Sequence, residues 1–152
     1  MRMFEVMSKE VQTVKPTMPA SDAWELMRRG DIHHLVVMDG SKILGILSDR
    51  DAGSRRGASL RAGHTVADLM TTQVVTRSPT DTIRSAANLM RGRTIGCLPI
   101  LNRGRLVGIV TVSDLLELLG RGADRGARVS RPRAATQWRV PHRKRRSATA
   151  SW

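Results

Sequence analysis

The sequence predicts an α+β protein built from two tandem β-α-β-β-α units that pack with approximate two-fold symmetry, followed by a disordered basic tail. The first observation is an internal repeat, because the chain matches itself without a gap when it is shifted by 63 residues. The second is that each copy holds one helical pattern followed by two apolar, strand-like runs. One copy is too small to bury both faces of a sheet, so the two copies are expected to pack together.

The repeat is supported by identities along the whole unit. In the first copy they are Met7, Val11, Thr13, Pro16, Thr17, Ala23, Met27, Arg28, Ile32, Leu35, Gly45, Ile46 and Asp51, and in the second Met70, Val74, Thr76, Pro79, Thr80, Ala86, Met90, Arg91, Ile95, Leu98, Gly108, Ile109 and Asp114. We predict copies at residues 3–57 and 66–120, a linker at 58–65 and the tail at 121–152.

Each copy opens with a short segment that ends at Met7 or Met70. In the second copy, Thr65 and Asp68 have the spacing of a capping box, which predicts a helical turn. A brief extended run follows, "EVQTV" in the first copy and "QVVTR" in the second, and a proline closes each run.

A helix is expected next in each copy. Pro19 suits the first turn of the first helix, where a missing N–H costs nothing, and Asp81 is a suitable N-cap for "TIRSAANLMR". Gly30 and Gly92 are expected to end the two helices. One apolar face of the second helix is formed by Ile83, Ala86, Ala87 and Met90.

Two strands joined by a turn are expected after each helix. They are "HHLVVM" and "KILGILS" in the first copy, and "GCLPIL" and "RLVGIVT" in the second. A last helix is expected to start after Ser48 and after Thr111. The second of these, "VSDLLELLG", is amphipathic, whereas Gly53 and Gly57 interrupt the first, which is expected to run into a loop.

Composition points to an aliphatic core and a reducing compartment. Aromatic residues make up 3% of the chain, and Cys97, expected to be a core thiol, is its single cysteine. One cysteine excludes a disulfide within the chain and fits the cytoplasm. No apolar run approaches the roughly 18 residues that a membrane span needs, and the N-terminus lacks the apolar region of a secretory signal.

The net charge of +13 lies mostly in the tail, since residues 121–152 carry +9 and residues 1–120 carry +4. The densest basic cluster is "HRKRR" at 142–146. The region Arg143–Arg146 could contact nucleic acid, an acidic partner or anionic lipid, with an affinity that salt would weaken. The simpler interpretation is a solvated extension without a partner.

Three pairs of motifs carry a resemblance to a known family. They are the openings "VMS…V.TV.P" and "LMT…V.T..P", the strands "HHLVVMDG" and "GCLPILNRG", and the closing motifs "GILSDRD" and "GIVTVSD". Over residues 3–120 each unit resembles the cystathionine-β-synthase (CBS) domain, and the tandem pair resembles a Bateman module. The resemblance implies a non-catalytic sensor that binds an adenine nucleotide (AMP, ADP, ATP) or a related adenosyl ligand in clefts between the repeats. It also implies a homodimer.

The closing motif is the predicted ribose site. Asp51 and Asp114 follow a strand in their copies, and a carboxylate can accept charge-assisted hydrogen bonds from both ribose hydroxyls. Ser48 and Thr111 add a hydroxyl three residues earlier, and a helix N-terminus nearby would favour a phosphate. The alternative is that Ser48 and Thr111 only cap the next helix, although the two roles can coexist.

His33, His34 and Arg50 are the predicted phosphate-binding residues. In some members of the family that this chain resembles, a basic residue at the start of this strand reaches the phosphate. The copy-two counterparts of the histidines, Gly96 and Cys97, carry no charge, so the copy-one side looks better suited to phosphate. Adjacent histidines on a strand point to opposite faces, so no metal site is predicted. Alternatively, one histidine is packed and the other solvated.

Catalysis has little support, because no Ser/His/Asp or Cys/His constellation recurs at a plausible cleft. We therefore expect no catalytic residues and no catalytic cofactor, and an adenine nucleotide as regulatory ligand. The competing hypothesis is a protein that binds nucleic acid or an acidic partner through the tail, with the repeat pair as its regulator.

Overall fold

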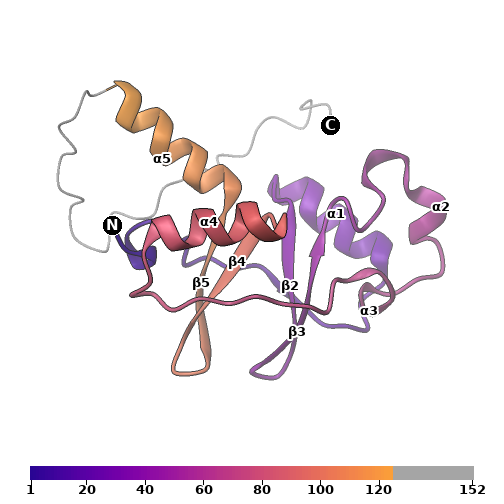
Figure 1. Cartoon of the computed structure of the whole chain (residues 1–152). Coiled ribbons are helices and arrows are strands. Elements are labelled where there is room, and N and C mark those ends of the chain that lie inside the picture. Colours follow the sequence, from indigo (N-terminus) through magenta and orange to yellow (C-terminus); the bar gives the residue numbers. More distant parts are fainter. Residues whose placement is uncertain (125–152) are drawn as a thin grey trace. The chain divides into compact units, whose positions relative to one another are not determined.

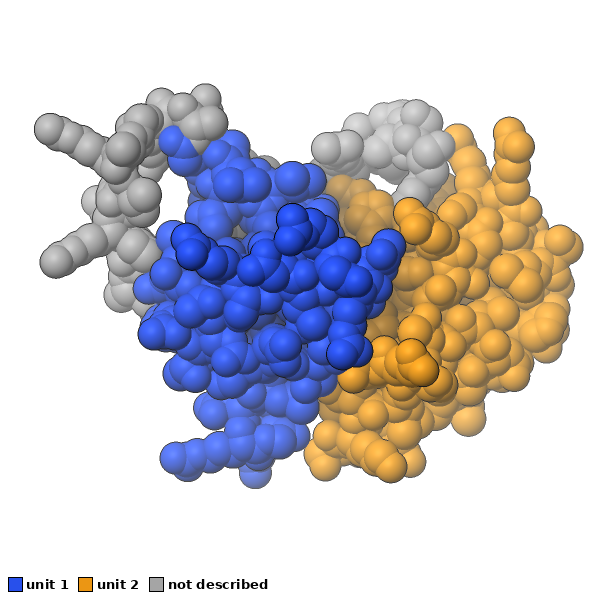
Figure 2. All heavy atoms as spheres, viewed as in Figure 1, with its two compact units in different colours: residues 1–11, 75–142 blue, residues 12–74, 143–152 orange. Residues whose placement is uncertain are grey.

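The computed structural model describes residues 1–124, and these form two compact units. Unit 1 contains residues 1–11 and 75–124, and unit 2 contains residues 12–74 (Figure 2). Each unit combines strands with helices, which confirms the predicted α+β class. Figure 1 shows the course of the chain through the elements described below.

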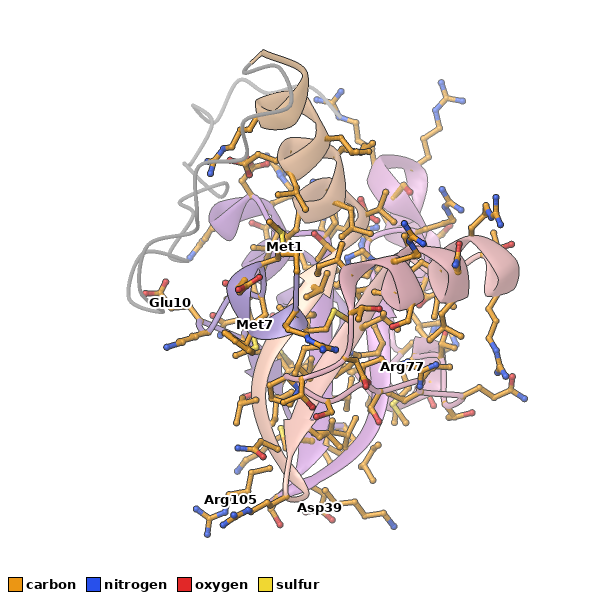
Figure 3. The ribbon with its side chains drawn as sticks, turned by 60° about the vertical axis from the view of Figure 1, so that its left-hand side comes forward. Met1, Met7, Glu10, Asp39, Arg77 and Arg105 are labelled. Carbon is orange, nitrogen blue, oxygen red and sulfur yellow. The ribbon has the colours of Figure 1, made fainter. Side chains whose placement is uncertain are left out.

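Unit 2 holds a three-stranded sheet in the order β1-β2-β3. Strand β1 (Thr13–Val14) runs parallel to β2 (His34–Asp39), which pairs antiparallel with β3 (Lys42–Ser48). Helix α1 (Ala20–Gly30) makes the crossover that a parallel pair requires. Asp39 lies at the tip of the β2–β3 hairpin (Figure 3). These elements confirm the helix and both long strands predicted for the first copy.

The segment after β3 is irregular, as the two glycines predict. It contains the short helices η2 (Ser54–Arg56) and α2 (Ala58–Arg61) in place of one long helix. Gly53 has a φ of +83°, and a Cβ on Gly57 would stand 2.5 Å from the Gly53 Cα, so both positions need glycine. Helix α3 (Val66–Leu69) follows.

The predicted capping box at the start of α3 is confirmed. The Thr65 backbone amide donates to Asp68 Oδ2 over 2.8 Å. Hydrogen bonds from the Thr65 backbone and side chain lower the pKa of the Asp68 carboxyl, despite a smaller opposing effect of desolvation.

Unit 1 holds a two-stranded sheet of β4 (Cys97–Asn102) and β5 (Arg105–Thr111), with Arg105 at the tip of the hairpin (Figure 3). Its helices are η1 (Met3–Glu5), α4 (Ile83–Arg93) and α5 (Val112–Asp124). The helix, the hairpin and the long last helix of the second copy were all predicted.

The extended run "QVVTR" forms no named strand in unit 1. Only Arg77 pairs, in a parallel bridge with Ile100. In unit 2 the Val36 amide donates to the Gln12 carbonyl over 3.1 Å, which extends the pairing of β1. The residue of unit 1 at the place of Val36 is Pro99, which has no N–H to donate. The parallel ladder therefore cannot extend there.

The N-cap of α4 is Thr82 rather than the predicted Asp81. The Thr82 hydroxyl accepts a hydrogen bond of 3.1 Å from the Ser85 amide. The Asp81 carboxylate instead accepts one of 2.9 Å from the Ser78 amide, in the preceding turn. Both residues are good capping types, and the position of the helix start decides between them.

The C-terminal ends of α1 and α4 differ from each other. Gly30 is the last residue of α1, as predicted, and Asp31 adopts the left-handed conformation with φ +49°. Helix α4 runs past Gly92 to Arg93, and Thr94 takes the left-handed position with φ +54°. The prediction that Gly92 ends its helix is therefore wrong by one residue.

Each unit has its own aliphatic core. In unit 2, Leu35 and Leu47 are fully buried, and Trp24 packs with them at 5% exposure. In unit 1, Leu98 and Val110 are fully buried. Trp24 is thus a residue of the core of unit 2.

The opening segment of the first copy packs in unit 1, on the hairpin of the second copy. Ser8 and Ile109 exchange two backbone hydrogen bonds of 2.9 Å beside β5. Met7 covers Gly108, where an added Cβ would stand 2.6 Å from the methionine sulfur (Figure 3 labels Met7).

The opening segment of the second copy makes the equivalent contacts in unit 2. Thr71 and Ile46 exchange backbone hydrogen bonds of 2.8 and 3.0 Å beside β3. A Cβ on Gly45 would stand 2.7 Å from the Thr71 carbonyl oxygen and 2.8 Å from the Met70 sulfur. The compact units thus divide the chain differently from the sequence copies, because each unit takes its opening segment from the other copy.

Candidate functional site

The copy-one residues predicted to bind ribose and phosphate meet at the open end of the β2–β3 hairpin. The strand register places His34 opposite Ser48. The Asp49 amide donates to the His33 carbonyl over 2.9 Å, so the turn at residues 49–51 begins beside the two histidines. All five residues predicted to bind ribose or phosphate in this copy therefore lie at this end of the hairpin. They are His33, His34, Ser48, Arg50 and Asp51.

Ser48 and Asp51 form a reciprocal capping pair. The Asp51 amide donates to Ser48 Oγ over 2.9 Å, and the Ser48 amide donates to Asp51 Oδ2 over 3.1 Å. The Thr71 hydroxyl also donates to Asp51 Oδ2, over 3.2 Å. The pair therefore closes the single turn that follows β3, with the hydrogen bonds of a helix cap but without a helix after it. Within residues 1–124, Asp51 Oδ1 makes no hydrogen bond, and the side chain is half-buried.

Thr111 and Asp114 repeat this arrangement in unit 1. The Thr111 amide donates to Asp114 Oδ2 over 2.8 Å, and the Asp114 amide donates to Thr111 Oγ1 over 3.3 Å. This pair is more deeply buried, with Asp114 4% exposed. Helix α5 starts directly after Thr111, so a helix N-terminus lies at this site. The corresponding prediction after Ser48 is wrong, because only a single turn forms there before Gly53.

Asp49 pairs with His33, a contact that the repeat comparison did not predict. His33 Nδ1 lies 3.0 Å from Asp49 Oδ2. Burial raises the pKa of the Asp49 carboxyl, but the hydrogen bond and the charge of His33, with the Arg50 amide, lower it below its ordinary value overall. Asp49 aligns with Val112 in the second copy, so only the hairpin register reveals the pair.

Thr71 is the second residue of this site that the sequence interpretation missed. A signal was available, because the openings "VMS" and "LMT" place Ser8 and Thr71 at equivalent positions, each directly after the methionine that packs on a glycine. The Thr71 hydroxyl connects the opening segment to Asp51. The Arg50 side chain is exposed and makes no hydrogen bond or ion pair with any residue that the structure describes.

The remaining predictions concern metals, membranes and the tail. Residues 1–124 contain no group of three or more His, Cys, Asp or Glu side chains arranged to hold a metal ion. None of the helices formed by these residues is both long and apolar enough to span a membrane. Cys97 is buried in β4 at 7% exposure, as expected of a core thiol. The Arg143–Arg146 region lies outside the described residues.

Comparison with known proteins places this geometry in a family. The CBS domain model matches residues 3–52 and 66–121. The CBS domain-containing protein YhcV of Bacillus subtilis is 34% identical over 112 residues, which cover 73% of this chain and 80% of YhcV. The CBS domain-containing protein DDB_G0289609 of Dictyostelium discoideum is 34% identical over 129 residues, covering 76% and 88% of the two chains.

Solved structures and enzymes also contain similar pairs. The CBS domain pair of protein MJ0100, crystallised with 5′-methylthioadenosine and S-adenosyl-L-methionine, is 25% identical, with a TM-score of 0.72 over 80% of this chain and 97% of that one. The inosine-5′-monophosphate dehydrogenase of Korarchaeum cryptofilum is 34% identical over 108 residues, but only 22% of that enzyme is covered. The family model matches both repeats of this chain, and the match covers most of the length of two relatives that are 34% identical. This chain therefore belongs to the CBS domain family, as a tandem CBS domain pair.

Proposed function

We propose that this protein is a regulatory module without catalysis of its own, which senses an adenine nucleotide (AMP, ADP or ATP) or a related adenosyl ligand. The MJ0100 pair supports the adenosyl class, because its crystals contain two such compounds. The observation that carries the proposal is the Ser48–Asp51 pair at the end of β3. We further propose a cytoplasmic location, since a single cysteine suits a reducing compartment.

The two carboxylate oxygens of Asp51 have different tasks in this proposal. Oδ2 accepts hydrogen bonds from the Ser48 amide and the Thr71 hydroxyl, so the fold itself holds the carboxylate in place. Oδ1 is then left to accept hydrogen bonds from the ribose hydroxyls, and a charged acceptor makes such bonds stronger than neutral ones. Thr71 would carry an effect of ligand binding into the opening segment of the second copy.

Arg50, His33 and His34 are proposed to bind the phosphate. The guanidinium of Arg50 is charged at every physiological pH and is exposed next to Asp51. His33 lies beside Asp49, and protonation of the imidazole would add a second positive charge. These residues favour a ligand that carries phosphate at the copy-one site.

Thr111 and Asp114 are proposed as the ribose residues of a second, weaker site. Their hydrogen bonds match those of the first copy, but the Asp114 side chain is only 4% exposed. The closing motif of this copy also has Val112 and Ser113 in place of Asp49 and Arg50, so it supplies no positive charge of its own.

Asp51→Asn is expected to weaken adenine nucleotide binding by about tenfold to a hundredfold, measured by titration calorimetry with AMP, ADP and ATP. Asparagine keeps one oxygen to accept the Ser48 amide, so the turn should survive. Its NH₂ group cannot accept a hydrogen bond from a ribose hydroxyl.

The matched control is Asp68→Asn, which removes the same charge from a similar capping pair in the same unit. This variant should bind nucleotide like the unmodified protein. Equal affinities of all three proteins for every nucleotide would show that Asp51 does not hold the ribose.

We also propose that two copies of the chain associate through α5. Val112, Leu116 and Leu119 lie on one face of this helix and are 41%, 62% and 67% exposed. Leu116→Glu is expected to yield a monomer in light scattering, because a second copy would have to bury the charge. The control Leu60→Glu alters an exposed leucine of α2 and should leave a dimer. A dimer that survives Leu116→Glu would contradict this interface.

A further inference from the structure

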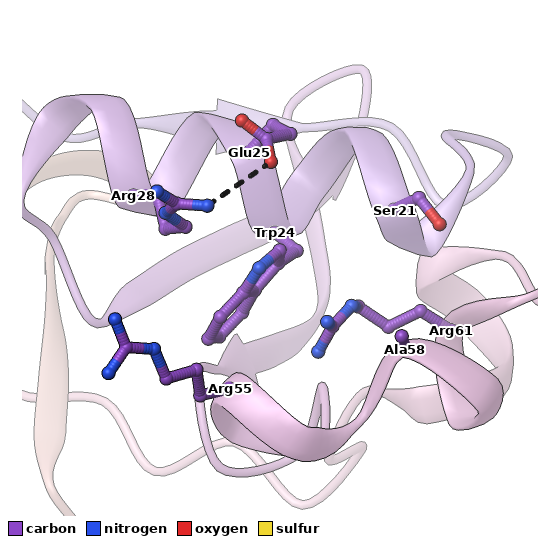
Figure 4. A pocket seen from close by; sticks show the side chains of 7 residues that line it. All are labelled: Ser21, Trp24, Glu25, Arg28, Arg55, Ala58 and Arg61. Atoms are coloured by element: carbon purple, nitrogen blue, oxygen red, sulfur yellow. Dashed lines mark ion pairs between the residues drawn. The ribbon is translucent and has the colours of Figure 1, made fainter. Parts of the chain in front are cut away.

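Unit 2 contains a cavity of about 350 Å³ that none of the residues proposed for nucleotide binding lines. Its walls come from α1 and from the irregular segment that replaces the last helix of the first copy (Figure 4). Helix α1 contributes Trp24, Glu25 and Arg28, and the irregular segment contributes Arg55, Ala58 and Arg61.

The wall formed by the irregular segment is held in place by Arg61. This side chain is 6% exposed, and its guanidinium carbon lies 4.3 Å from the centre of the Trp24 ring, in a cation–π contact. Arg61 Nη1 donates to the carbonyls of Ala52 and Ser54, over 2.8 and 2.6 Å. Within the described part of the chain, Nε and Nη2 make no hydrogen bond, so donors remain for a ligand.

The lining of the cavity has an excess of positive charge. Glu25 is its one acidic residue, and this carboxylate pairs with Arg28 over 3.7 Å and with Arg29 over 3.9 Å. Arg55 and Arg61 form no ion pair with any residue from 1 to 124. Two guanidinium groups therefore face a cavity whose wall includes an indole ring (Figure 4), and the negative charge of Glu25 acts on Arg61 without an ion pair between the two side chains.

This arrangement is specific to the first copy. The position of Trp24 is taken by Ala87 in the second copy, and that of Arg55 by Leu118, within the continuous helix α5. In unit 2 the segment departs from a helix at Gly53 and Gly57, which are in close backbone contact. With this irregular course, Arg55 and Arg61 lie opposite the side of α1 that carries Trp24 (Figure 4).

We propose that this cavity binds a small ligand with a phosphate group, which the guanidinium groups of Arg55 and Arg61 hold. The planar fork of arginine donors matches the oxygens of a phosphate in a bidentate way. A volume of about 350 Å³ is at the lower end of the range of ligand sites, which suits a small phosphorylated metabolite. None of the residues that line this cavity belongs to the proposed nucleotide site at Asp51.

Inorganic phosphate is the probe for the test, with succinate as a dianion that lacks phosphorus. Titration calorimetry of the full chain should show phosphate binding that Arg55→Gln weakens by about tenfold or more. Arg56→Gln is the matched control, because Arg56 is the next residue of η2, is exposed and does not line the cavity. This control should bind phosphate with unchanged affinity. In a protein with Trp138→Phe and Trp152→Phe, phosphate should also change the emission of Trp24.

The outcomes separate this proposal from its competitors. If Arg55→Gln and Arg56→Gln weakened phosphate binding equally, the proposal would be overturned, because the affinity would then depend on net charge alone. Tighter binding of succinate than of phosphate, or no phosphate binding at millimolar concentration, would overturn it as well. Asp51→Asn tests the nucleotide proposal with AMP, ADP and ATP, whereas Arg55→Gln tests this one with inorganic phosphate, so failure of the nucleotide proposal and failure of this one are distinguishable.

Discussion

Replacing Leu98 by alanine is expected to lower the free energy of unfolding by about 2–5 kcal/mol, measured by urea denaturation. Leu98 is fully buried in β4, where it packs in the core of unit 1 with Met3, Met7 and Ile100. Truncation removes buried apolar surface and leaves a cavity that the hairpin and the methionines can fill only in part. The core of unit 1 has few aromatic side chains, so each aliphatic residue carries a large share of its packing.

The equivalent change in the first copy, Leu35→Ala, should have a similar effect, because Leu35 is also fully buried, in the core of unit 2. The control is Leu60→Ala, an exposed leucine for which we expect a change of less than about 1 kcal/mol. A loss below 1 kcal/mol for both Leu98→Ala and Leu35→Ala would mean that these hairpins are not the centres of the two cores.

Local patterns predicted most of the elements, because each pattern reports on contacts within a few residues. The paired apolar runs located both hairpins, and the amphipathic period located α4 and α5. Element ends were less accurate, because several residues near each end satisfy the same capping preference. Asp81 and Thr82 illustrate this, since both are good N-caps and only the helix start decides between them.

The exchange of opening segments was not predictable from these patterns. A 63-residue repeat shows that Met7 and Met70 occupy equivalent places, but not which hairpin each one covers. The hairpin that each methionine covers depends on the path of the chain between the copies. In the structure, Met70 packs on Gly45, in the hairpin of the first copy. Comparing the copies also concealed Asp49, whose pairing with His33 has no counterpart in the second copy.

The closing motif was recognised as a shared feature, yet its internal geometry needed the structure. The spacing of Ser48 and Asp51 was compatible with a cap, a ligand site or both. The hydrogen bonds show that the cap exists and that it uses one carboxylate oxygen, Oδ2. The ribose proposal therefore assigns ribose binding to the second carboxylate oxygen, Oδ1, and assigns to Thr71 a part in holding the carboxylate in place.

Gly45→Ala is expected to destabilise the protein by about 1–3 kcal/mol, measured by urea denaturation, and to weaken nucleotide binding. The added methyl group would stand 2.7 Å from the carbonyl oxygen of Thr71, a backbone atom that cannot rotate away. Relief requires the opening segment of the second copy to move off β3. Because the Thr71 hydroxyl donates to Asp51, that movement would also remove one support of the proposed ribose carboxylate.

Gly92→Ala provides a control with the same chemical change and the opposite expected sign. Gly92 lies within α4, and an added Cβ would meet no atom within 4 Å. Alanine should therefore stabilise the protein by about 0.5–1 kcal/mol, because it restricts the unfolded chain and favours the helix. If Gly45→Ala were as stable as the unmodified protein, the opening segment would not be docked on β3. If it lost stability but bound nucleotide normally, Thr71 would have no part in holding Asp51 for the ribose.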